Sequence, residues 1–371
     1  MPTDTRDDLA LAADQLRVLA ARHADEADAT RRLAPEVVAA LRGAGFARHF
    51  VAGRFGGREG SFRDLTRAVA TVGEGCASTA WCASLIAYSA RFASLLPEDG
   101  HRALWGGNPD AIIATALMPA GRAVRESGGW RLSGQWAYVS GIDFADWVLL
   151  CSPVVGESNG GPPPARFFAL PTGSYTVRET WDSIGMRATG SHTVVVDDQL
   201  VPDHLSYPRT EMVSGRNATS AVPAHNVPFQ AVGGLTFIAP VLGAAAGALQ
   251  ACVAALTGKR RTPSLELGLI RASAMIDAAR FLIDQNGEVI DERRFTPDEM
   301  ARNERNATYS AEILVEAVGV LIACAGSSGL AEALPLQRFW RDVVSASSHI
   351  ALKYDTAARR NYSAVLLGPE A

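Results

Sequence analysis

A serine and a glycine interrupt a stretch of aromatic and β-branched residues near the middle of the chain. The stretch GGWRLSGQWAYVSGIDFADWVLL (128–150) predicts two strands, and Ser140 and Gly141 stand where a bulky side chain is expected. A serine hydroxyl can donate and accept hydrogen bonds, and glycine lets a backbone approach a ligand closely. The alternative is a plain turn between two strands, for which both residues are common.

His349 is the second residue suited to chemistry. Helical spacing places it on one face with Asp342, Ser345, Ala346 and Lys353, so we expect it on the polar stripe of a helix. Because the ordinary pKa of histidine is about 6.5, a neutral imidazole there could bind or release a proton near neutral pH. The alternative is a solvated surface histidine.

Several common kinds of active site are missing from the sequence. The glycine-rich stretches GRFGGREG and GEGCAS follow helical segments, whereas a dinucleotide-binding turn follows a strand. There is no P-loop, no HExxH and no GxSxG elbow, and the seven histidines are spread singly, so we expect no metal site. The chemistry must therefore come from a cofactor that is bound by other means.

Composition narrows the class of protein further. The chain has 371 residues, 48% of them apolar and 20% charged, and its net charge of −4 argues against a nucleic-acid partner. The five cysteines are odd in number and lack CxxC spacing, which favours a reducing compartment. The longest apolar run, 235–256, contains a proline and glycines, which favours a buried helix over a membrane span. These features predict a cytoplasmic enzyme without a membrane partner.

The hydrophobic period changes twice along the chain. It is helical over 1–110, strand-like with turn residues over 111–208, and helical again over 209–371. We therefore predict an α+β protein with an N-terminal helical domain, a central β-domain and a C-terminal helical bundle.

Three stretches carry a resemblance to a known family. Residues 34–81 contain a proline-capped helix, a turn with paired glycines and a further helix. GMRATGSHTVVVDDQLVPDH (185–204) looks like the end of a β-domain, and ACAGSSGLAEALPLQRFWRDV (323–343) has a glycine-rich turn before a helix with an Arg-Asp pair. In this order they resemble the acyl-CoA dehydrogenase superfamily, which implies a β-barrel or sandwich followed by a four-helix bundle.

The resemblance implies a flavin between the β-domain and the bundle. Ser140 would then place an O–H donor within hydrogen-bond reach of the flavin N5/O4 edge, and Gly141 would let the backbone come close. FAD and FMN stay open, because no adenine pocket can be recognised, and Gly326 and Ser327 would approach from a neighbouring subunit. The other residues that the resemblance places at the cofactor are Trp81, Ser84, Thr115, Leu117, Tyr138, Val139 and Arg260.

WRDVVSASSHIALKYD (340–355) resembles one branch of the superfamily, the two-component flavin-dependent monooxygenases. That branch implies reduced flavin (FADH2 or FMNH2) from a separate NAD(P)H-dependent reductase, O2 as co-substrate, and hydroxylation of an aromatic or polycyclic substrate through a C4a-hydroperoxyflavin. His349 would accept a phenolic proton or hold the phenolate, and Ser140 would restrain the N5 proton, which slows loss of H2O2. A homo-oligomer built as a dimer of dimers is also implied.

Two other reactions and a non-catalytic role remain open. Some relatives oxygenate an amine nitrogen, as on amino sugars. True acyl-CoA dehydrogenases desaturate a thioester, which needs a positioned carboxylate to remove a proton from carbon. The final segment RRNYSAVLLGPEA has no matching glutamate, because Glu370 stands in the extreme tail. A flavin-binding or structural role without catalysis is the last alternative.

Overall fold

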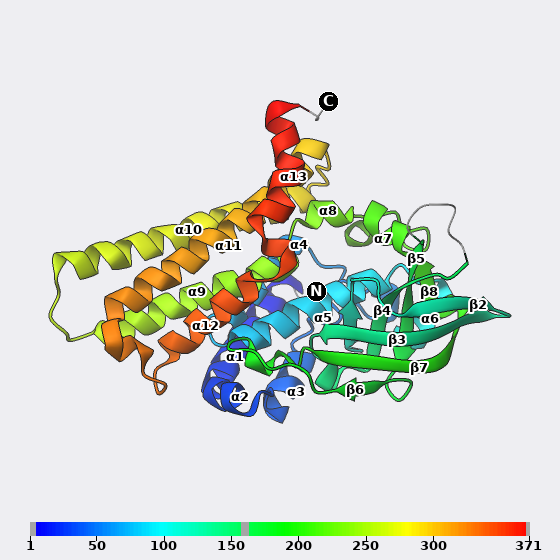
Figure 1. Cartoon of the computed structure of the whole chain (residues 1–371), viewed down its shortest axis with the longest axis horizontal. Coiled ribbons are helices and arrows are strands. Elements are labelled where there is room, and N and C mark those ends of the chain that lie inside the picture. Colours follow the sequence, from blue (N-terminus) through cyan, green and yellow to red (C-terminus); the bar gives the residue numbers. More distant parts are fainter. Residues whose placement is uncertain (1–4, 157–162, 369–371) are drawn as a thin grey trace.

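Helices, then strands, then helices follow one another along the chain (Figure 1). The computed structural model describes residues 5–156 and 163–368, so Glu370 lies outside the described residues. The first group of helices is α1 (Thr5–Arg22), α2 (Ala24–Thr30), α3 (Pro35–Gly43), α4 (Phe62–Gly73), α5 (Ala77–Ala93) and α6 (Glu98–Trp105), with the 3-10 turn η1 (Gly53–Phe55).

Two four-stranded sheets form the middle of the chain, in the orders β1-β4-β5-β8 and β2-β3-β7-β6. The sheets are joined by Trp136, which is buried and donates its indole N–H to the Cys151 carbonyl at 2.6 Å. The short edge strands β2 and β8 were not predicted. The strands are β1 (Ile113–Ala116), β2 (Arg122–Glu126), β3 (Gly129–Val139), β4 (Trp147–Pro153), β5 (Ala165–Pro171), β6 (Thr176–Arg178), β7 (His192–Pro202) and β8 (Ser206–Pro208).

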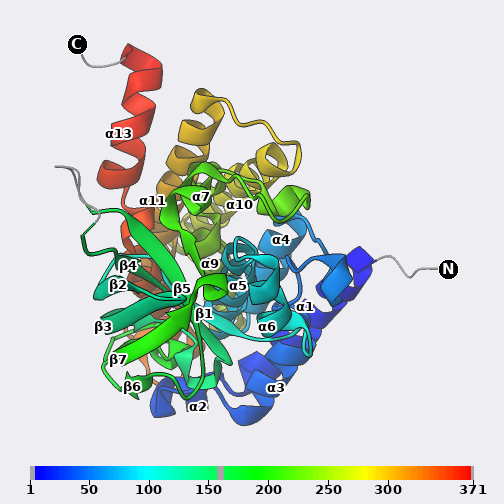
Figure 2. The same ribbon diagram turned by 90° about the vertical axis from the view of Figure 1, so that its right-hand side faces the viewer.

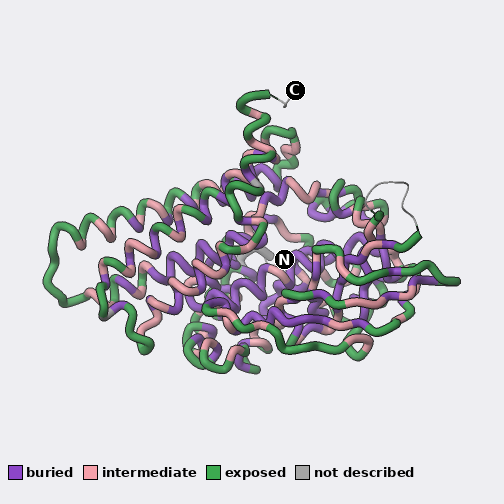
Figure 3. The backbone as a smooth tube through the Cα atoms, in the orientation of Figure 1, coloured by how far each residue is buried: buried purple, intermediate pink, exposed green. Residues whose placement is uncertain are grey.

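Helices α10, α11 and α12 pack against α9, most of whose residues are buried (Figure 3). By length and composition two helices could span a membrane, Phe229–Leu256 and Pro297–Ala325, but 72% of the apolar window of the first is buried inside the fold. A buried core helix accounts for that run, as the sequence predicts. The helices are α7 (Arg209–Ser214), α8 (Phe229–Val232), α9 (Leu235–Leu256), α10 (Pro263–Asp291), α11 (Pro297–Ala325), α12 (Pro335–Ser347) and α13 (Tyr354–Leu367).

The helix predicted to run through His349 ends before that residue, so the prediction that His349 lies on the polar stripe of a helix is wrong. Helix α12 ends at Ser347, and His349 instead caps the 3-10 turn η7 (Ile350–Leu352). The Ser348 hydroxyl donates to the Ser345 carbonyl at 2.6 Å. Serine side chains that bond nearby backbone compete with helical bonds, which accounts for the break. Asp342 is buried and Lys353 is exposed, so the two do not share a polar face with His349.

Helices α4 and α9 approach each other through glycines, so the first helices and the bundle share one core. A Cβ on Gly243 would lie 2.1 Å from the Ala70 carbonyl oxygen, and one on Gly247 would lie 2.6 Å from that of Glu74. Only glycine permits this spacing. Figure 2 shows the first helices beside the sheets, with α13 projecting away from both. The division into three domains stays a prediction, although α6 ends at Trp105 and α7 begins at Arg209.

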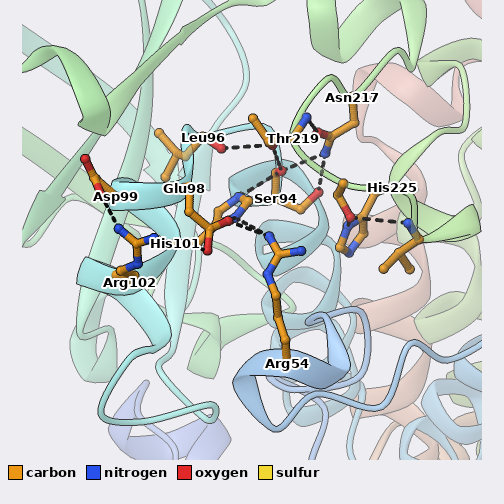
Figure 4. Close-up of polar contacts among 12 residues, drawn as sticks. Arg54, Ser94, Leu96, Glu98, Asp99, His101, Arg102, Asn217, Thr219 and His225 are labelled. Atoms are coloured by element: carbon orange, nitrogen blue, oxygen red, sulfur yellow. Dashed lines mark hydrogen bonds and ion pairs between the residues drawn. The ribbon is translucent and has the colours of Figure 1, made fainter.

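The irregular segment 215–228, here called the strap, fastens α7 and α8 to the end of α5 (Figure 4). The Asn217 side-chain amide donates to the Ser94 carbonyl at 2.6 Å, and the Thr219 hydroxyl donates to the Leu96 carbonyl at 3.1 Å. These carbonyls follow the last turn of α5, where helix carbonyls lack partners within the helix. The strap therefore caps α5.

The buried side chains of Arg91 and His225 hold the second half of the strap, residues 220–227. Arg91 donates to the Ala224 carbonyl at 2.8 Å and also to the Val227 carbonyl. His225 bonds the Ser220 hydroxyl at 2.7 Å through Nδ1 and the Phe50 carbonyl through Nε2. Because both ring nitrogens are occupied and the ring is buried, His225 has a structural role in the strap.

Candidate functional site

Ser140 lies at a corner where β3 ends. Gly141 has φ 75°, which starts the 3-10 turn η2 (Ile142–Phe144), and its N–H donates to the Thr189 carbonyl at 2.8 Å. Tyr138 has φ 61°, a conformation that costs a non-glycine residue free energy. This corner is the gap that the sequence shows in its aromatic stretch, and it leaves Ser140 half-buried.

A row of polar groups backs Ser140, and we call it the hydroxyl chain. The Trp81 indole N–H, from α5, donates to Ser140 Oγ at 3.1 Å. Ser140 Oγ is 2.7 Å from Ser191 Oγ, which is 2.7 Å from Thr189 Oγ1, which is 3.0 Å from the Met186 carbonyl oxygen. Ser191 and Thr189 are buried. The sequence analysis missed both, although they stand in the stretch 185–204 that carries the resemblance.

His349 packs in an aromatic cluster formed with Phe237 and Trp81. Its ring stacks on Phe237 with 3.8 Å between centroids and 25° between planes, and it meets Trp81 edge to face at 5.9 Å. Phe237 comes from the first turn of α9 and was not predicted, because its pattern is that of an ordinary core residue. The cluster brings α5, α9 and η7 together, and its Trp81 ring is the member that bonds Ser140.

Burial sets the protonation state of His349. It lowers the pKa of the ring to about 4, so the imidazole is neutral at neutral pH. Nδ1 accepts a hydrogen bond from the Ala351 N–H at 3.2 Å, and therefore the proton of the neutral ring resides on Nε2. Nε2 makes no hydrogen bond to the described residues, so the site presents one N–H donor there.

Asp342 is a buried carboxylate, although its spacing predicted a place on the polar stripe of a helix. Its Oδ1 accepts from the Met186 N–H at 2.5 Å, which ties α12 to the loop before β7. Burial raises the pKa of this carboxyl to about 6, and Arg338 moderates the rise. Because the side chain is buried and already engaged, it is a structural contact and is not exposed to a substrate.

Four further predicted cofactor residues lie on β1, β3 and α5. Tyr138 is exposed and meets Trp181 edge to face at 6.3 Å, whereas Val139 is buried. The Thr115 hydroxyl donates to Ser89 Oγ at 2.8 Å. The Ser84 hydroxyl is buried and donates to the Thr236 carbonyl at 2.6 Å. The structure thus engages the hydroxyls of Thr115 and Ser84 within the fold and does not direct them to Ser140.

Three of the four remaining predicted residues are separated from Ser140. Leu117 follows β1 and is half-buried. Arg260 lies between α9 and α10, and Gly326 and Ser327 lie between α11 and α12. Figure 1 shows both connections at the end of the bundle that is distant from the sheets. Within one copy of the chain, these three residues do not join the site.

One surface hollow lies outside the candidate site. A surface hollow of about 670 Å³ lies on the strap beside Arg293, away from the hydroxyl chain. Among residues 5–156 and 163–368, no three His, Cys, Asp or Glu side chains are grouped as a metal site. The corner at Ser140 and the aromatic cluster around His349 therefore form the candidate site.

Acidification is expected to destabilise the fold through buried histidines. Burial lowers the pKa of both His49 and His225 from 6.5 to about 4. As the pH falls from 6.5 to 4, the unfolded chain binds protons that the folded chain does not, so the free energy of unfolding decreases, by up to about 3 kcal/mol for each ring. Urea unfolding at pH 7.5 and pH 5 measures this loss.

Asp342 acts in the opposite direction and provides the control. Its pKa is about 6 in the folded protein and 3.8 in the unfolded chain, so the folded state binds the proton first and gains stability between pH 6 and pH 4. Asp342→Asn removes this offset, and its loss of stability on acidification should exceed that of the wild type. An unfolding free energy that does not change between pH 7.5 and pH 5 contradicts the assignment of these pKa shifts.

Comparisons with known proteins agree on one group. The family model described as acyl-CoA dehydrogenase, C-terminal domain, matches residues 235–354. The oxygenase component of FADH(2)-dependent resorcinol hydroxylase from Rhizobium sp. (strain MTP-10005) is 30% identical over 361 residues, covering 90% of this chain and 87% of that protein. The flavin-dependent monooxygenase oxygenase subunit HsaA from Mycobacterium tuberculosis is 32% identical over 354 residues, covering 88% of each.

A solved structure extends the similarity to three dimensions. XiaF from Streptomyces sp., in complex with FADH2 and glycerol, superposes with a TM-score of 0.90 at 26% sequence identity. The match covers 99% of this chain and 96% of that one. The similarity therefore includes all three helical and β-stranded parts of the fold.

Proposed function

Because this chain belongs to the oxygenase components of flavin-dependent monooxygenases, which have the acyl-CoA dehydrogenase fold, we propose that it hydroxylates a phenolic aromatic substrate between Ser140 and His349. Membership confirms the predicted superfamily, the α+β fold and an oxidoreductase that uses reduced flavin and O2. The observation that carries the phenolic substrate is the Nε2–H donor of His349, held against the aromatic cluster.

The residues at the corner fit a flavin. The ring system of a flavin is planar and apolar on its faces with polar groups on its edge, and the corner offers the same combination. Trp81 supplies aromatic surface, and the half-buried Ser140 hydroxyl beside it supplies a polar contact. We propose that Trp81, Tyr138, Val139 and Ser140 hold the ring, with Leu117 nearby.

The chain's own groups bind and orient the substrate. Bound reduced flavin supplies the electrons that activate O2 for transfer of an oxygen atom to the substrate. His349 donates its Nε2–H to the phenolic oxygen, and Phe237 fixes the imidazole plane by stacking. A hydrogen bond to that oxygen favours the phenolate, which enriches the aromatic ring in electrons. The tautomer therefore supports holding the phenolate over direct acceptance of its proton.

We also propose FADH2 as the flavin and a separate NAD(P)H-dependent reductase as its source. Two relatives are described with FADH2, and the resorcinol hydroxylase is described as one component of its enzyme. No dinucleotide-binding turn occurs in the sequence, which supports a separate protein as the source of reducing equivalents.

A homo-oligomer in the cytoplasm completes the proposal. Leu267, Ile270 and Phe281 project from α10 with more than half of their surface exposed, and Leu366 and Leu367 do so on the projecting α13. Apolar side chains gathered on the outside of a bundle favour contact with other copies. Gly326, Ser327 and Arg260 would reach a flavin only across such a contact.

The experiment supplies anaerobically reduced FAD, or reduced FMN in parallel, to the protein and then adds O2 with a set of phenols. The expected result is one added oxygen atom per phenol, detected by mass spectrometry with labelled O2, and little H2O2. Matched non-phenolic aromatics should give mainly H2O2, because their rings offer His349 no oxygen.

Two outcomes would redirect the assignment. Labelled oxygen on nitrogen when amino sugars or other amines replace the phenols would favour N-oxygenation. Formation of an unsaturated thioester from an acyl-CoA, without labelled oxygen, would favour desaturation. If neither reduced flavin binds, the family resemblance reflects the fold alone.

A further inference from the structure

The two ends of the hydroxyl chain have fixed hydrogen-bonding roles. At one end the Trp81 indole N–H can only donate, so Ser140 Oγ accepts from it. At the other end the Met186 carbonyl can only accept, and its oxygen is 3.0 Å from Thr189 Oγ1, so the Thr189 hydroxyl donates to it. Neither end can reverse, because neither an indole nor a carbonyl can exchange its role.

The protons between these ends can then be assigned. Each hydroxyl has one proton, and that of Thr189 is directed to Met186. Ser191 must therefore donate to Thr189, and Ser140 must donate to Ser191, across two contacts of 2.7 Å. The Met186 carbonyl also accepts from the Trp181 indole N–H at 2.9 Å, but in the reverse order the lone pairs of Thr189 Oγ1 and of this carbonyl would face each other at 3.0 Å, which is unfavourable. Within the described residues these hydroxyls have no competing partner.

The direction of the chain determines what Ser140 can offer a ligand. Its proton is engaged with Ser191, and one lone pair is engaged with Trp81. A second lone pair remains on the half-buried oxygen. Ser140 is therefore an acceptor toward a ligand at this corner, which reverses the donor role that the sequence suggests.

We propose that Ser191 and Thr189 are positioning residues that hold Ser140 as a hydrogen-bond acceptor, and that the corner thereby selects reduced over oxidised flavin. The inference rests on the proposed flavin contact of Ser140. N5 of reduced flavin has a hydrogen and donates, so it matches the free lone pair. N5 of oxidised flavin has only a lone pair, which would face the lone pair of Ser140 without a bond.

This selection suits an enzyme that takes its flavin from solution. Reduced flavin arrives from another protein and oxidised flavin leaves at the end of the reaction. An acceptor at the corner stabilises the arriving form and releases the departing one. The preference arises from Thr189 and Ser191, although neither touches the flavin in this arrangement.

The test is the dissociation constant of FAD in each redox state, measured anaerobically for the full chain. We expect the wild type to prefer the reduced form. Ser191→Ala frees the Ser140 proton to turn outward, and Thr189→Val frees the Ser191 proton to turn toward Ser140, which displaces the Ser140 proton. Each change should lower the ratio of oxidised to reduced dissociation constants by about tenfold. Thr189→Ser keeps the hydroxyl and should restore the ratio.

The outcomes separate this inference from the proposed function. If both redox states bind the wild type and the variants weaken both equally, the hydroxyls have only a structural role and the inference is wrong. An unchanged ratio in Ser191→Ala and Thr189→Val also overturns it. If the wild type binds neither form of FAD or FMN, the proposed flavin site itself fails. Ser140→Ala should abolish the preference and leave Ser191→Ala without further effect.

Discussion

Replacing His349 with leucine is expected to lower aromatic hydroxylation by about 100- to 1000-fold, while O2 continues to oxidise the reduced flavin. The only N–H donor that the ring presents to a substrate is Nε2–H, because Nδ1 accepts from Ala351. Leucine retains an apolar contact with Phe237 but provides no donor to the phenolic oxygen. When both are measured in the same reaction, the hydroxylated product should decrease and H2O2 should increase.

His349→Gln is the matched control, since its side chain keeps an N–H donor. We expect it to recover part of the hydroxylation that leucine loses. Because the pKa of His349 is lowered to about 4, the rate above pH 5 should follow the ionisation of the phenol and not that of histidine. A rate that falls with a midpoint near 6.5 for every phenol in a series would contradict the neutral, Nε2-protonated ring.

Gly243→Ala should reduce the free energy of unfolding by about 3 kcal/mol, the upper part of the range for overpacked cores. The new Cβ would lie 2.1 Å from the Ala70 carbonyl oxygen and 2.7 Å from Gly73 Cα. Both are backbone atoms of α4, so no side chain can rotate away and the two helices must separate. Urea unfolding at neutral pH measures the change.

Gly319→Ala tests the same substitution in an open position. Gly319 lies inside α11, and a Cβ there meets nothing within 4 Å. Alanine should therefore stabilise the protein by about 0.5–1 kcal/mol, because it loses less conformational entropy on folding. If the two alanine variants change the free energy of unfolding equally, helix propensity and not the approach of α4 to α9 determines that change.

The parts of the site that the sequence predicts are those with a local signal. Gly141 interrupts an aromatic strand, and its φ of 75° accounts for that interruption. The residues TPDE (296–299) have the pattern of a helix cap, and α11 does begin there, with Thr296 accepting from the Glu299 N–H at 3.2 Å. In both cases the residue type that forms the turn or the helix cap can be recognised in the sequence itself.

The parts that sequence did not predict depend on contacts between distant segments. Phe237 and His349 are more than a hundred residues apart, and their stacking follows from how η7 folds back on α9. Ser191 and Thr189 look like ordinary small polar residues until the 3-10 turn η3 (Arg187–Thr189) and the start of β7 place them behind Ser140. The hydrophobic period wrongly predicted one continuous helix through His349. Serines whose hydroxyls bond the nearby backbone have the same polar spacing in the sequence as the exposed face of a helix.

The backbone of Met186 connects two parts of the molecule, so a change in one of them reaches the other. Its N–H is held by Asp342 of α12, and its carbonyl ends the hydroxyl chain at Ser140. One peptide unit on either side of this residue thus serves both the contact between β-domain and bundle and the redox preference that we propose for the corner. A substitution that shifts α12 at Asp342 would also move the carbonyl that ends the hydroxyl chain. The packing of the bundle against the β-domain and the proposed choice of flavin are therefore expected to change together.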